Sequence, residues 1–442
     1  MKNDILLIGG GKSAGVLIEY LEGLASEYDW KISVLSNDTK LIASTSLQVH
    51  EVDVLKKGVA AKWVSNSRLV ISMLPAHLHF PIAEACLEFK KHFLTASYVS
   101  PEMQSLHKTV KENALLFLNE CGLDPGLDHM SAMRIIDSIK EKNGVIKGFE
   151  SFTGGLISPR SDNNPWHYKL TWNPRNVVLA GQGGVAKFKQ NGTYKYIPYQ
   201  QLFKRTELIT VPKYGRFEGY ANRDSLKYGS LYQLKEIETL YRGTLRQVGF
   251  CKAWSKLVHL GMTDDSYVLN GIKGMSYRSF TNLFLAYHST DSVEMKFQRV
   301  LGIEQDDFSI IEKMEYLGLF SEDKIPLEEG TPAQVLQDLL ERKWKLESDD
   351  KDMIVMWHKF NYIIDGEEKE IQSSLVVEGT SQAQTAMAKT VGLPMGIAAK
   401  LILQGKVPET GVKIPTARSI YEPILEELSQ KFSINFNEET IR

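Results

Sequence analysis

The chain has 442 residues, of which 43% are apolar and 24% are charged, and its formal net charge is -2. These fractions are close to the averages of soluble globular proteins, so they argue against a disordered, collagen-like or coiled-coil chain. At about 150 residues per domain, the length suggests about three structural units. A near-neutral chain has no global field to hold nucleic acid or anionic lipid, so we expect a small-molecule partner.

The cysteines and the first residues indicate a reducing compartment. Cys86, Cys121 and Cys251 are odd in number and far apart, with no CxxC pair, which fits neither a disulfide framework nor a zinc knuckle. The apolar run at residues 5–8 is too short for the core of a signal peptide, and we find no run of about 18 apolar residues. We therefore expect a cytoplasmic protein without a membrane span.

The first 125 residues alternate near-continuous apolar runs with helix-like stretches. The runs lie at residues 5–9, 32–35, 69–74, 93–96 and 115–118, and the helix-like stretches at 13–27, 54–65, 78–91 and 101–112. Apolar runs of this length suit strands that are buried on both faces of a parallel sheet. The alternation predicts right-handed βαβ units in a doubly wound, Rossmann-type sheet.

A glycine-rich turn follows the first apolar run and has the spacing G-x-G-x-x-A. Gly9 permits the tight turn, Gly11 lets the backbone approach a pyrophosphate, and Ala14 allows close helix–strand packing. The start of the next helix adds amide donors for an anion. We predict that Gly9, Gly11, Lys12, Ser13 and Ala14 bind a dinucleotide, whereas a merely structural turn is the alternative.

Two further segments belong to the predicted cofactor site. Ser36 and Asn37 end the second apolar run, where an acidic residue typically selects NAD and an arginine NADP. Asp38 lies beyond the expected tip and Lys40 could meet a 2′-phosphate, so the sequence leaves NAD and NADP open. Leu74 and Pro75 end the third run and are expected at the same edge of the sheet.

The remainder of the chain changes character twice. Apolar residues at helical spacing from Met130 to Ile139 predict a helix that stops at Asn143-Gly144; a strand at 145–153 and a loop at 154–165 follow. Amphipathic stretches at 252–260, 308–318 and 333–343 predict a helical insertion. Strand-like patterns return at 350–378, and a last helical stretch includes residues 385–392 and 397–405.

Several sequence blocks resemble the glutamate-forming saccharopine dehydrogenase family. They occur in the family's order over most of the chain and are weakest in the helical insertion. The blocks are Ser97-Tyr98-Val99, Asn119–Met130 (with Gly-Leu-Asp-Pro-Gly-Leu-Asp-His), Gly154-Gly155-Leu156 with Asn164-Pro165 and Tyr168-Lys169, Asn222–Ser225, Arg242–Arg246 and Ala386–Pro394. Three positions depart from the family's common residues: Thr153 replaces Cys, Ile157 replaces Pro and Ala221 replaces Pro. A hydroxyl at Thr153 can hydrogen-bond but is not easily ionised as a thiol is.

The resemblance implies an α/β fold in three parts. Residues 1–125 plus 381–442 would form the Rossmann dinucleotide-binding domain, and residues 126–250 plus 346–380 a mixed-sheet α/β substrate domain. Residues 251–345 would form the α-helical insertion. The oligomeric state is left open, with a homodimer as one option.

The resemblance also implies the reaction and its residues. Saccharopine, a secondary amine with three carboxylates, would be oxidised by NAD or NADP and hydrolysed to L-glutamate and 2-aminoadipate 6-semialdehyde, as part of lysine metabolism and without a metal. Three carboxylates call for forked donors, which guanidinium groups supply. Tyr98 and Asp124 are the catalytic candidates; the substrate-binding candidates are Ser97, Thr153, Lys169, Asn222, Arg223, Arg242 and Arg246.

Purely structural roles stay open for several of these residues. Asp124 could be a turn residue before Pro125, Tyr98 a packed aromatic ring, and Lys169 and Asn222 structural groups. Two other functions also stay open: an oxidoreductase for another imine-linked, carboxylated amine of the polyamine type, and a catalytically silent nucleotide-binding sensor.

Overall fold

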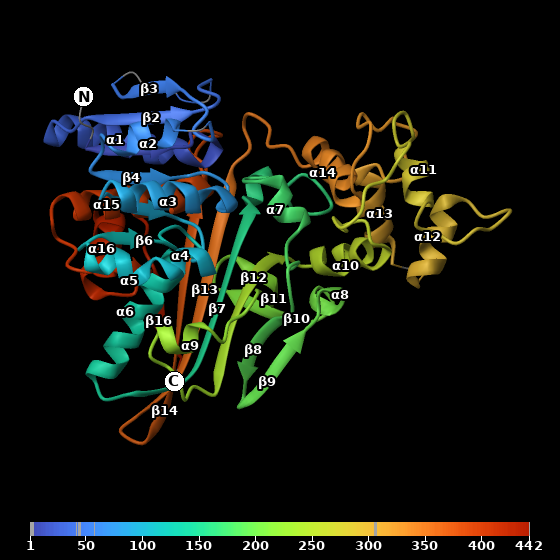
Figure 1. Ribbon diagram of the computed structural model, residues 1–442. Coiled ribbons are helices and arrows are strands. Elements are labelled where there is room, and N and C mark those ends of the chain that lie inside the picture. Colours follow the sequence, from blue (N-terminus) through green and yellow to red (C-terminus); the bar gives the residue numbers. More distant parts are fainter. Residues whose placement is uncertain (1–3, 41, 43–45, 57, 305–306, 442) are drawn as a thin grey trace. The chain divides into compact units, whose positions relative to one another are not determined.

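The computed structural model describes residues 4–40, 42, 46–56, 58–304 and 307–441, except for the side chain of Lys12 (Figure 1). The chain divides into two compact units. The first unit contains Met1–Ile146, Leu231–Gln233 and Phe360–Arg442, and the second contains Lys147–Ser230 and Leu234–Lys359. Each unit has its own buried core.

The first unit is built on a seven-stranded parallel sheet. Its strands are β1 (Ile5–Ile8), β2 (Ile32–Ser36), β3 (Gln48–Glu51), β4 (Leu69–Ser72), β5 (His92–Thr95), β6 (Leu116–Leu118) and β15 (Gly411–Lys413). The order β3-β2-β1-β4-β5-β6-β15 reverses direction between β1 and β4, which is the strand order of a Rossmann sheet with its ligand crevice at the reversal. Because β1, β2 and β4 to β6 are buried throughout or nearly so, the prediction of strands covered on both faces is confirmed.

Helices connect these strands and cover the sheet. They are α1 (Gly15–Tyr28), α2 (Val59–Val64), α3 (His79–Glu88), α4 (Pro101–Ser105), α5 (His107–Glu112), α6 (Leu127–Glu141), α15 (Ala386–Leu403) and α16 (Arg418–Phe432), with short 3-10 turns η1 (Lys12–Ala14) and η2 (Ala76–Leu78). Two predicted helices differ from the structure. The one at 54–65 begins only at Val59, after Gly58 with φ +79°, and the one at 101–112 is interrupted at Leu106.

Helix α15 is one continuous helix and covers most of the last predicted helical stretch. Pro394 lies inside it, and two glycines let it approach α1 closely: a Cβ at Gly392 would lie 2.9 Å from the Leu17 nitrogen, and one at Gly396 would lie 2.4 Å from the Tyr20 ring. By length and composition it is apolar enough to cross a membrane, but 83% of that stretch is buried inside the protein. Burial of this kind is typical of a core helix.

The second unit contains a mixed sheet. Its strands are β7 (Val145–Ile157), β8 (Ala186–Gln190), β9 (Thr193–Ile197), β10 (Thr206–Val211), β11 (Gly215–Ala221), β12 (Thr239–Gln247) and β13 (Asp352–Ile364). The main path runs β10-β11-β12-β7-β13, with β12 parallel to β7 and antiparallel to β11. The predicted loop at 154–165 is wrong at its start, because β7 continues to Ile157 and uses Gly154 where Leu245 of β12 leaves no room for a side chain.

The second unit also contains helices, and those from Phe250 onward lie in the stretch predicted as a helical insertion. The helices are α7 (Pro174–Val178), α8 (Tyr199–Leu202), α9 (Tyr228–Leu231), α10 (Phe250–Leu260), α11 (Tyr277–Asn282), α12 (Val293–Leu301), α13 (Phe308–Leu317) and α14 (Pro332–Lys343), with the 3-10 turn η3 (Pro159–Ser161). The amphipathic stretches predicted as helices lie in α10, α13 and α14. Trp166, Trp254 and Trp344 contact one another at ring-centroid distances of 5.3–6.2 Å and are fully buried, so they form part of the core.

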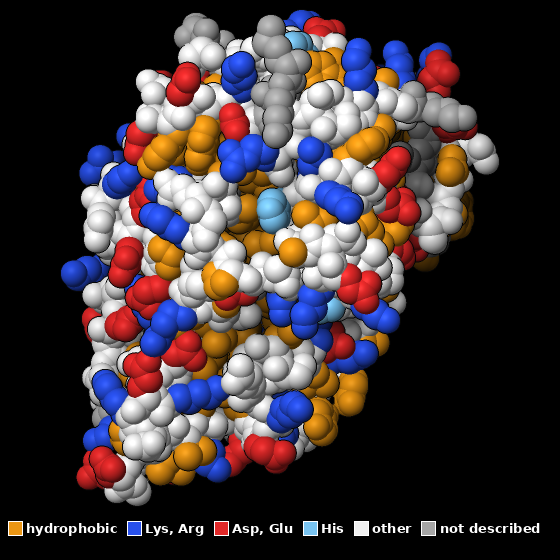
Figure 2. All heavy atoms as spheres, turned by 60° about the vertical axis from the view of Figure 1, so that its left-hand side comes forward, with side chains coloured by type: hydrophobic (Ala, Val, Ile, Leu, Met, Phe, Trp, Pro, Cys, Tyr) orange, Lys and Arg blue, Asp and Glu red, His pale blue; other side chains and the backbone are white. Residues whose placement is uncertain are grey.

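One further strand pair belongs to the first unit: β14 (Glu367–Glu378) pairs antiparallel with β16 (Asn437–Thr440). Acidic and basic side chains are interspersed on the face drawn in Figure 2, without a continuous block of one sign. Such a distribution agrees with the near-zero net charge and offers no broad basic surface on that face.

Candidate active site

The glycine turn after β1 has the geometry of a pyrophosphate cradle. Gly9 has φ +104°, and a Cβ there would meet the backbone of Met73 at 3.0 Å, so only glycine fits between β1 and β4. Gly11 precedes η1, and a Cβ there would have no neighbour within 4 Å. Because Gly11 faces open space at the start of a helix, its backbone is free to approach a dinucleotide.

The other predicted cofactor residues lie along the same edge of the sheet. Ala14 is 1% exposed and packs at the start of α1. Ser36 ends β2, and its hydroxyl both accepts from the Asp38 amide and donates to the Asp38 carbonyl; Asn37 is exposed. The predicted role of the Lys12 side chain lies outside the described residues.

Asp38 does not occupy the strand tip as an NAD-selecting acid would. Its carboxylate accepts a hydrogen bond from the Lys40 amide at 3.0 Å, in a turn beyond β2. Leu74 and Pro75 follow β4, where the Met73 amide donates to the Ile8 carbonyl and keeps this segment beside Gly9. The turn, the tip of β2 and the segment after β4 therefore surround the reversal of strand order.

Both catalytic candidates lie beyond the ends of β5 and β6. The Tyr98 hydroxyl donates to Asp124 Oδ1 at 3.5 Å, and both residues are half-buried. Asp124 precedes a cis peptide bond to Pro125, and at Gly126 (φ +150°) a Cβ would lie 2.0 Å from the carbonyl oxygen of Gly122. The Gly-Leu-Asp-Pro-Gly block is thus a tight loop that presents the Asp124 carboxylate beside Tyr98.

A buried polar network holds this loop, and the sequence analysis missed it. Glu120 is 2% exposed; its carboxylate accepts the Val99 amide at 3.0 Å and contacts His129 Nε2 at 2.9 Å. The other ring nitrogen of His129 bonds the Tyr232 hydroxyl at 2.6 Å. Glu120 therefore connects the segment after Tyr98 to α6, the helix that directly follows the Asp124 loop. The sequence signal that could have pointed to Glu120 is its position within the family block Asn119–Met130.

In the second unit, the predicted substrate residues gather on one face of the sheet. Arg242 and Arg246 are four residues apart on β12, so both point to the same side. Thr153 of β7 pairs in register with Thr244, which lies between them. Arg242, Arg246 and Thr153 are each 4–5% exposed, so three polar side chains are buried together.

Arg246 is enclosed by aromatic rings. Its guanidinium carbon lies 5.1 Å from the ring of Tyr168, 5.8 Å from Tyr220 and 5.4 Å from Phe250, and it donates one hydrogen bond to the Leu245 carbonyl. Among the described residues, no carboxylate lies within ion-pair distance of it, and its Nε atom has no hydrogen-bond partner. A buried cation in this state calls for an anionic ligand.

Further unsatisfied atoms lie near Arg246. Thr153 Oγ1 and Tyr168 Oη are buried and have no hydrogen-bond partner in the part of the chain that the structure describes. Burial raises the pKa of Tyr220 to about 12, partly offset by Arg246, so its hydroxyl stays neutral at pH 7. Buried polar atoms without partners are uncommon in folded proteins, so this face is suited to a polar ligand.

The remaining substrate candidates have different surroundings. The Asn222 amide donates to the Arg242 carbonyl at 2.9 Å, and Arg223 follows it with φ +48° and an exposed side chain. Arg242 lies over the Tyr228 ring at 4.2 Å. Lys169 is 3% exposed and forms an ion pair with Asp350 at 2.5 Å. The charge of Lys169 is thus balanced within the protein, which favours a structural role for it.

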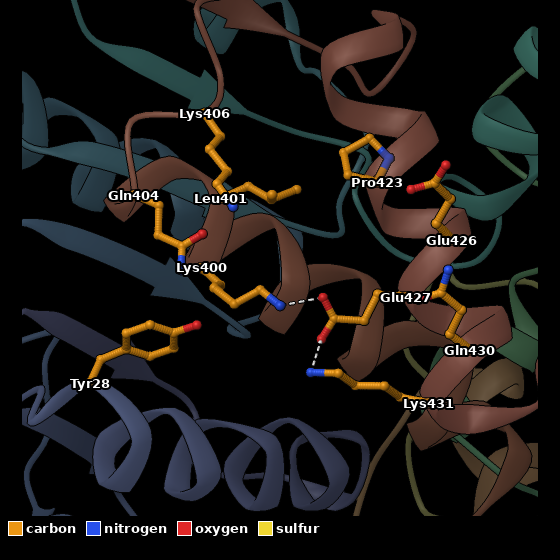
Figure 3. Close-up of a pocket in the computed structure, with 10 residues that line it drawn as sticks. All are labelled: Tyr28, Lys400, Leu401, Gln404, Lys406, Pro423, Glu426, Glu427, Gln430 and Lys431. Carbon is orange, nitrogen blue, oxygen red and sulfur yellow. Dashed lines mark hydrogen bonds and ion pairs between the residues drawn. The ribbon is translucent and has the colours of Figure 1, made fainter.

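A cavity of about 240 Å³ elsewhere in the first unit is drawn in Figure 3. Its wall includes Tyr28 and Lys400, and Glu427 accepts hydrogen bonds there from Lys400 and Lys431. Tyr28 ends α1 just before β2 begins, so the cavity lies toward the amino ends of the strands. Since the glycine turn lies at the carboxyl ends, this cavity is not the cofactor site.

The fold and the turn define a Rossmann-type dinucleotide-binding protein, and comparison with known proteins narrows this class. The family described as "Saccharopine dehydrogenase NADP binding domain" matches residues 5–118, and "Saccharopine dehydrogenase C-terminal domain" matches residues 122–434. The chain belongs to the saccharopine dehydrogenase family. The predicted resemblance, the α/β fold class and the nicotinamide dinucleotide domain are therefore confirmed.

Individual relatives agree with this assignment. The chain is 31% identical over 455 residues to "Saccharopine dehydrogenase [NADP(+), L-glutamate-forming]" of Saccharomyces cerevisiae, covering 100% of both chains. It is 32% identical to the mitochondrial alpha-aminoadipic semialdehyde synthase of Mus musculus, of which it covers 48%. The solved apo saccharopine dehydrogenase (L-Glu forming) from S. cerevisiae superimposes with a TM-score of 0.89 at 30% identity, over the whole of both chains.

A more distant structure shares the fold alone. Homospermidine synthase from Legionella pneumophila, solved in complex with NAD, superimposes with a TM-score of 0.57 at 10% identity and covers 91% of that chain. At this identity the likeness concerns architecture and not substrate.

Proposed function

We propose that this protein is an NADP-dependent, glutamate-forming saccharopine dehydrogenase. It interconverts saccharopine, NADP+ and water with L-glutamate, 2-aminoadipate 6-semialdehyde, NADPH and a proton, in lysine metabolism. The observation that carries the proposal is Arg246, a buried guanidinium with no carboxylate partner among the described residues, which a carboxylate-bearing substrate would supply. Relatives of full length carry the same activity in their names.

The tip of β2 favours NADP over NAD. An NAD site typically directs a carboxylate at the ribose 2′-hydroxyl, but here Asn37 follows the strand and the Asp38 carboxylate accepts from the Lys40 amide. The exposed Lys40 side chain is available for a 2′-phosphate. We expect kcat/KM to be higher with NADP+ than with NAD+.

Tyr98 and Asp124 would carry out proton transfer: Asp124 as the proton acceptor and Tyr98 as the group that orients it. A bound nicotinamide would supply a hydride acceptor for the carbon of the secondary amine, whose oxidation would give an imine. The Asp124 carboxylate would accept a proton as water adds to that imine carbon, while Tyr98, 3.5 Å away, orients the carboxylate. Breaking the carbon–nitrogen bond of the resulting carbinolamine releases glutamate and the aldehyde.

Three arginines and Thr153 would bind the rest of the substrate. Arg246 and Arg242 are buried on one face of the second sheet and Arg223 is exposed; each can form a bidentate pair with a carboxylate. Thr153 Oγ1 has no hydrogen-bond partner among the described residues and could donate to the same ligand. Ser97 and Asn222 belong to the proposed set as hydrogen-bonding groups, and Lys169 supports it through Asp350.

Steady-state kinetics with purified protein tests the proposal. Saccharopine with NADP+ should produce reduced-nicotinamide absorbance, and the reverse mixture should consume it. Absence of turnover in both directions with NADP and NAD would contradict the proposal and favour a silent nucleotide-binding protein. Turnover of a carboxyalkyl polyamine in preference to saccharopine would favour the other oxidoreductase.

Two further parts of the proposal concern the protein in the cell. We propose a cytoplasmic location and a homodimer as the oligomeric state. Fluorescence microscopy of a tagged chain tests the location. Analytical ultracentrifugation at several protein concentrations tests the dimer, and a single species of 49.9 kDa at all of them would contradict it.

A further inference from the structure

The buried side chain of His79 contacts the predicted substrate residue Ser97. His79 is the first residue of α3 and is 4% exposed. Its Nδ1 atom hydrogen-bonds the Ser72 hydroxyl at 2.9 Å. Its Nε2 atom hydrogen-bonds the Ser97 hydroxyl at 2.8 Å and the Thr95 hydroxyl at the longer distance of 3.2 Å. Both ring nitrogens therefore have hydrogen-bond partners: Ser72 at the end of β4 and Ser97 after β5.

The location of this histidine is that of the reaction crevice. Ser72 ends β4 and is in register with Ile8 of β1 on one side and with Thr95 of β5 on the other. The imidazole thus lies at the carboxyl ends of strands adjacent to the reversal of strand order, where Rossmann proteins bind their ligands. Tyr98, which contacts Asp124, is the next residue after Ser97.

Ser97 is fixed by its backbone, and His79 fixes the remaining freedom of its side chain. The Ser97 amide donates to Thr95 Oγ1 at 3.3 Å, and its carbonyl accepts the Glu120 amide at 3.0 Å. Among the residues with described positions, His79 is the single hydrogen-bond partner of the Ser97 hydroxyl. Without the imidazole, that hydroxyl could turn among its three staggered rotamers.

The charge state of His79 suits this task. Burial, with a contribution from His77, lowers the pKa of His79 to about 4, so the ring is neutral at pH 7. A neutral ring has one donor and one acceptor. If Nε2 accepts from Ser97, the serine oxygen presents lone pairs to a substrate ammonium or N–H group; if Nε2 donates, the serine O–H points toward a carboxylate. In either tautomer the imidazole fixes the polarity of Ser97.

We propose that His79 is a positioning residue for the reaction: it orients the Ser97 hydroxyl toward the substrate and does not touch the substrate itself. The inference rests on the proposed function, because saccharopine is the ligand that Ser97 would bind. It makes His79 a determinant of substrate affinity that acts through the Ser97 hydroxyl, its shorter contact on Nε2.

A double-mutant cycle tests this proposal. Wild type, His79→Phe, Ser97→Ala and the double variant are compared by kcat and KM for saccharopine and by calorimetric binding of saccharopine. Loss of one hydrogen bond to a charged ligand corresponds to about a tenfold rise in KM, and we expect it in both single variants. Because His79 acts through Ser97, the double variant should have the KM of Ser97→Ala within about twofold.

Two companion variants separate positioning from folding. His79→Gln keeps a polar atom near the position of Nε2 and should recover most of the affinity that His79→Phe loses. His77→Gln alters an exposed histidine in the same segment and should behave as wild type. Recovery by glutamine would show that a hydrogen bond, and not ring packing, is responsible.

The outcomes are distinct. If the effects of the two single variants multiply in the double variant, or if His79→Phe leaves KM unchanged, the positioning role is wrong while the proposed function stands. If the wild type neither binds nor turns over saccharopine, the proposed function fails, and the positioning role falls with it.

Discussion

Glu218 and Arg246 are direct cross-strand partners in β11 and β12, yet they do not form an ion pair. The Glu218 carboxylate instead accepts the amides of Gly249 and Cys251, at 2.9 Å each, at the start of α10. A carboxylate at a helix N-terminus is stabilised by those amides and by the helix dipole. The nearest acidic residue along the sheet is therefore engaged elsewhere, and Arg246 remains available for a ligand.

Replacing Arg246 should separate binding from stability. In Arg246→Met we expect KM for saccharopine to rise about 100-fold, because truncating one partner of a buried charged contact removes about 3 kcal/mol. The free energy of unfolding of the ligand-free protein should not fall, since an uncompensated buried charge is removed. Steady-state kinetics and urea unfolding measure the two effects. Arg216→Met, at an exposed position of β11, is the matched control; equal effects of both substitutions would contradict the assigned role.

Substitution of Gly11 should weaken cofactor binding without harm to the fold. Gly11 has φ -71°, which alanine tolerates, and a new Cβ meets no protein atom within 4 Å. We expect Gly11→Ala to weaken NADPH binding at least about tenfold, with a change in unfolding free energy below about 0.5 kcal/mol. Fluorescence titration and urea unfolding test this.

Gly9→Ala provides the contrast in the same turn. Its φ of +104° and the approach of Met73 at 3.0 Å should lower stability by about 1–3 kcal/mol. Unimpaired cofactor binding by Gly11→Ala would show that the dinucleotide does not pass over this turn.

The buried Lys169–Asp350 pair should matter for stability. Lys169→Met leaves the Asp350 carboxylate buried with its charge unbalanced, and breaking such a pair typically costs about 3–5 kcal/mol. Replacing both residues, with Asp350→Leu, should recover most of this loss. Urea unfolding of the two variants measures it. A Lys169→Met protein with unchanged stability and a raised KM would assign Lys169 to the substrate instead.

His79 should contribute to the dependence of stability on pH. Its pKa is about 4 in the folded protein and about 6.5 in the unfolded chain, so between these values the unfolded state binds more protons. Stability from this group is present above pH 6.5 and declines as the pH falls toward 4. Between pH 7 and pH 5 the wild type should lose about 2 kcal/mol that His79→Gln does not lose. Urea unfolding of both proteins at the two pH values measures this difference. If wild type and His79→Gln lose the same unfolding free energy between pH 7 and pH 5, a neutral His79 in the folded protein is contradicted.

Local patterns were sufficient to predict the first sheet and the cofactor turn. The apolar runs that became β1, β2, β4, β5 and β6 are short and continuous, and the glycine spacing directly follows the first of them. Elements formed by distant contacts were missed: β15 has three residues and pairs with β6 almost 300 residues earlier. Its sequence, Gly411-Val412-Lys413, carries no signal without that partner.

Local sequence patterns also could not predict which side chains contact one another at the site. Arg246 was predicted from its block, but its lack of a carboxylate partner depends on where Glu218 points, which strand pairing alone does not decide. His79 was not among the predicted site residues, since its contacts with Ser72 and Ser97 join three separate segments. Lys169 matched the family block, yet its ion pair is with Asp350, 181 residues later.

Product analysis tests the central claim most directly. Purified protein is incubated with saccharopine and NADP+, and the L-glutamate formed is measured against the NADPH formed. We expect one glutamate for each NADPH, together with an aldehyde that reacts with a carbonyl reagent. NADPH accompanied by lysine and 2-oxoglutarate, or no NADPH at all, would contradict it.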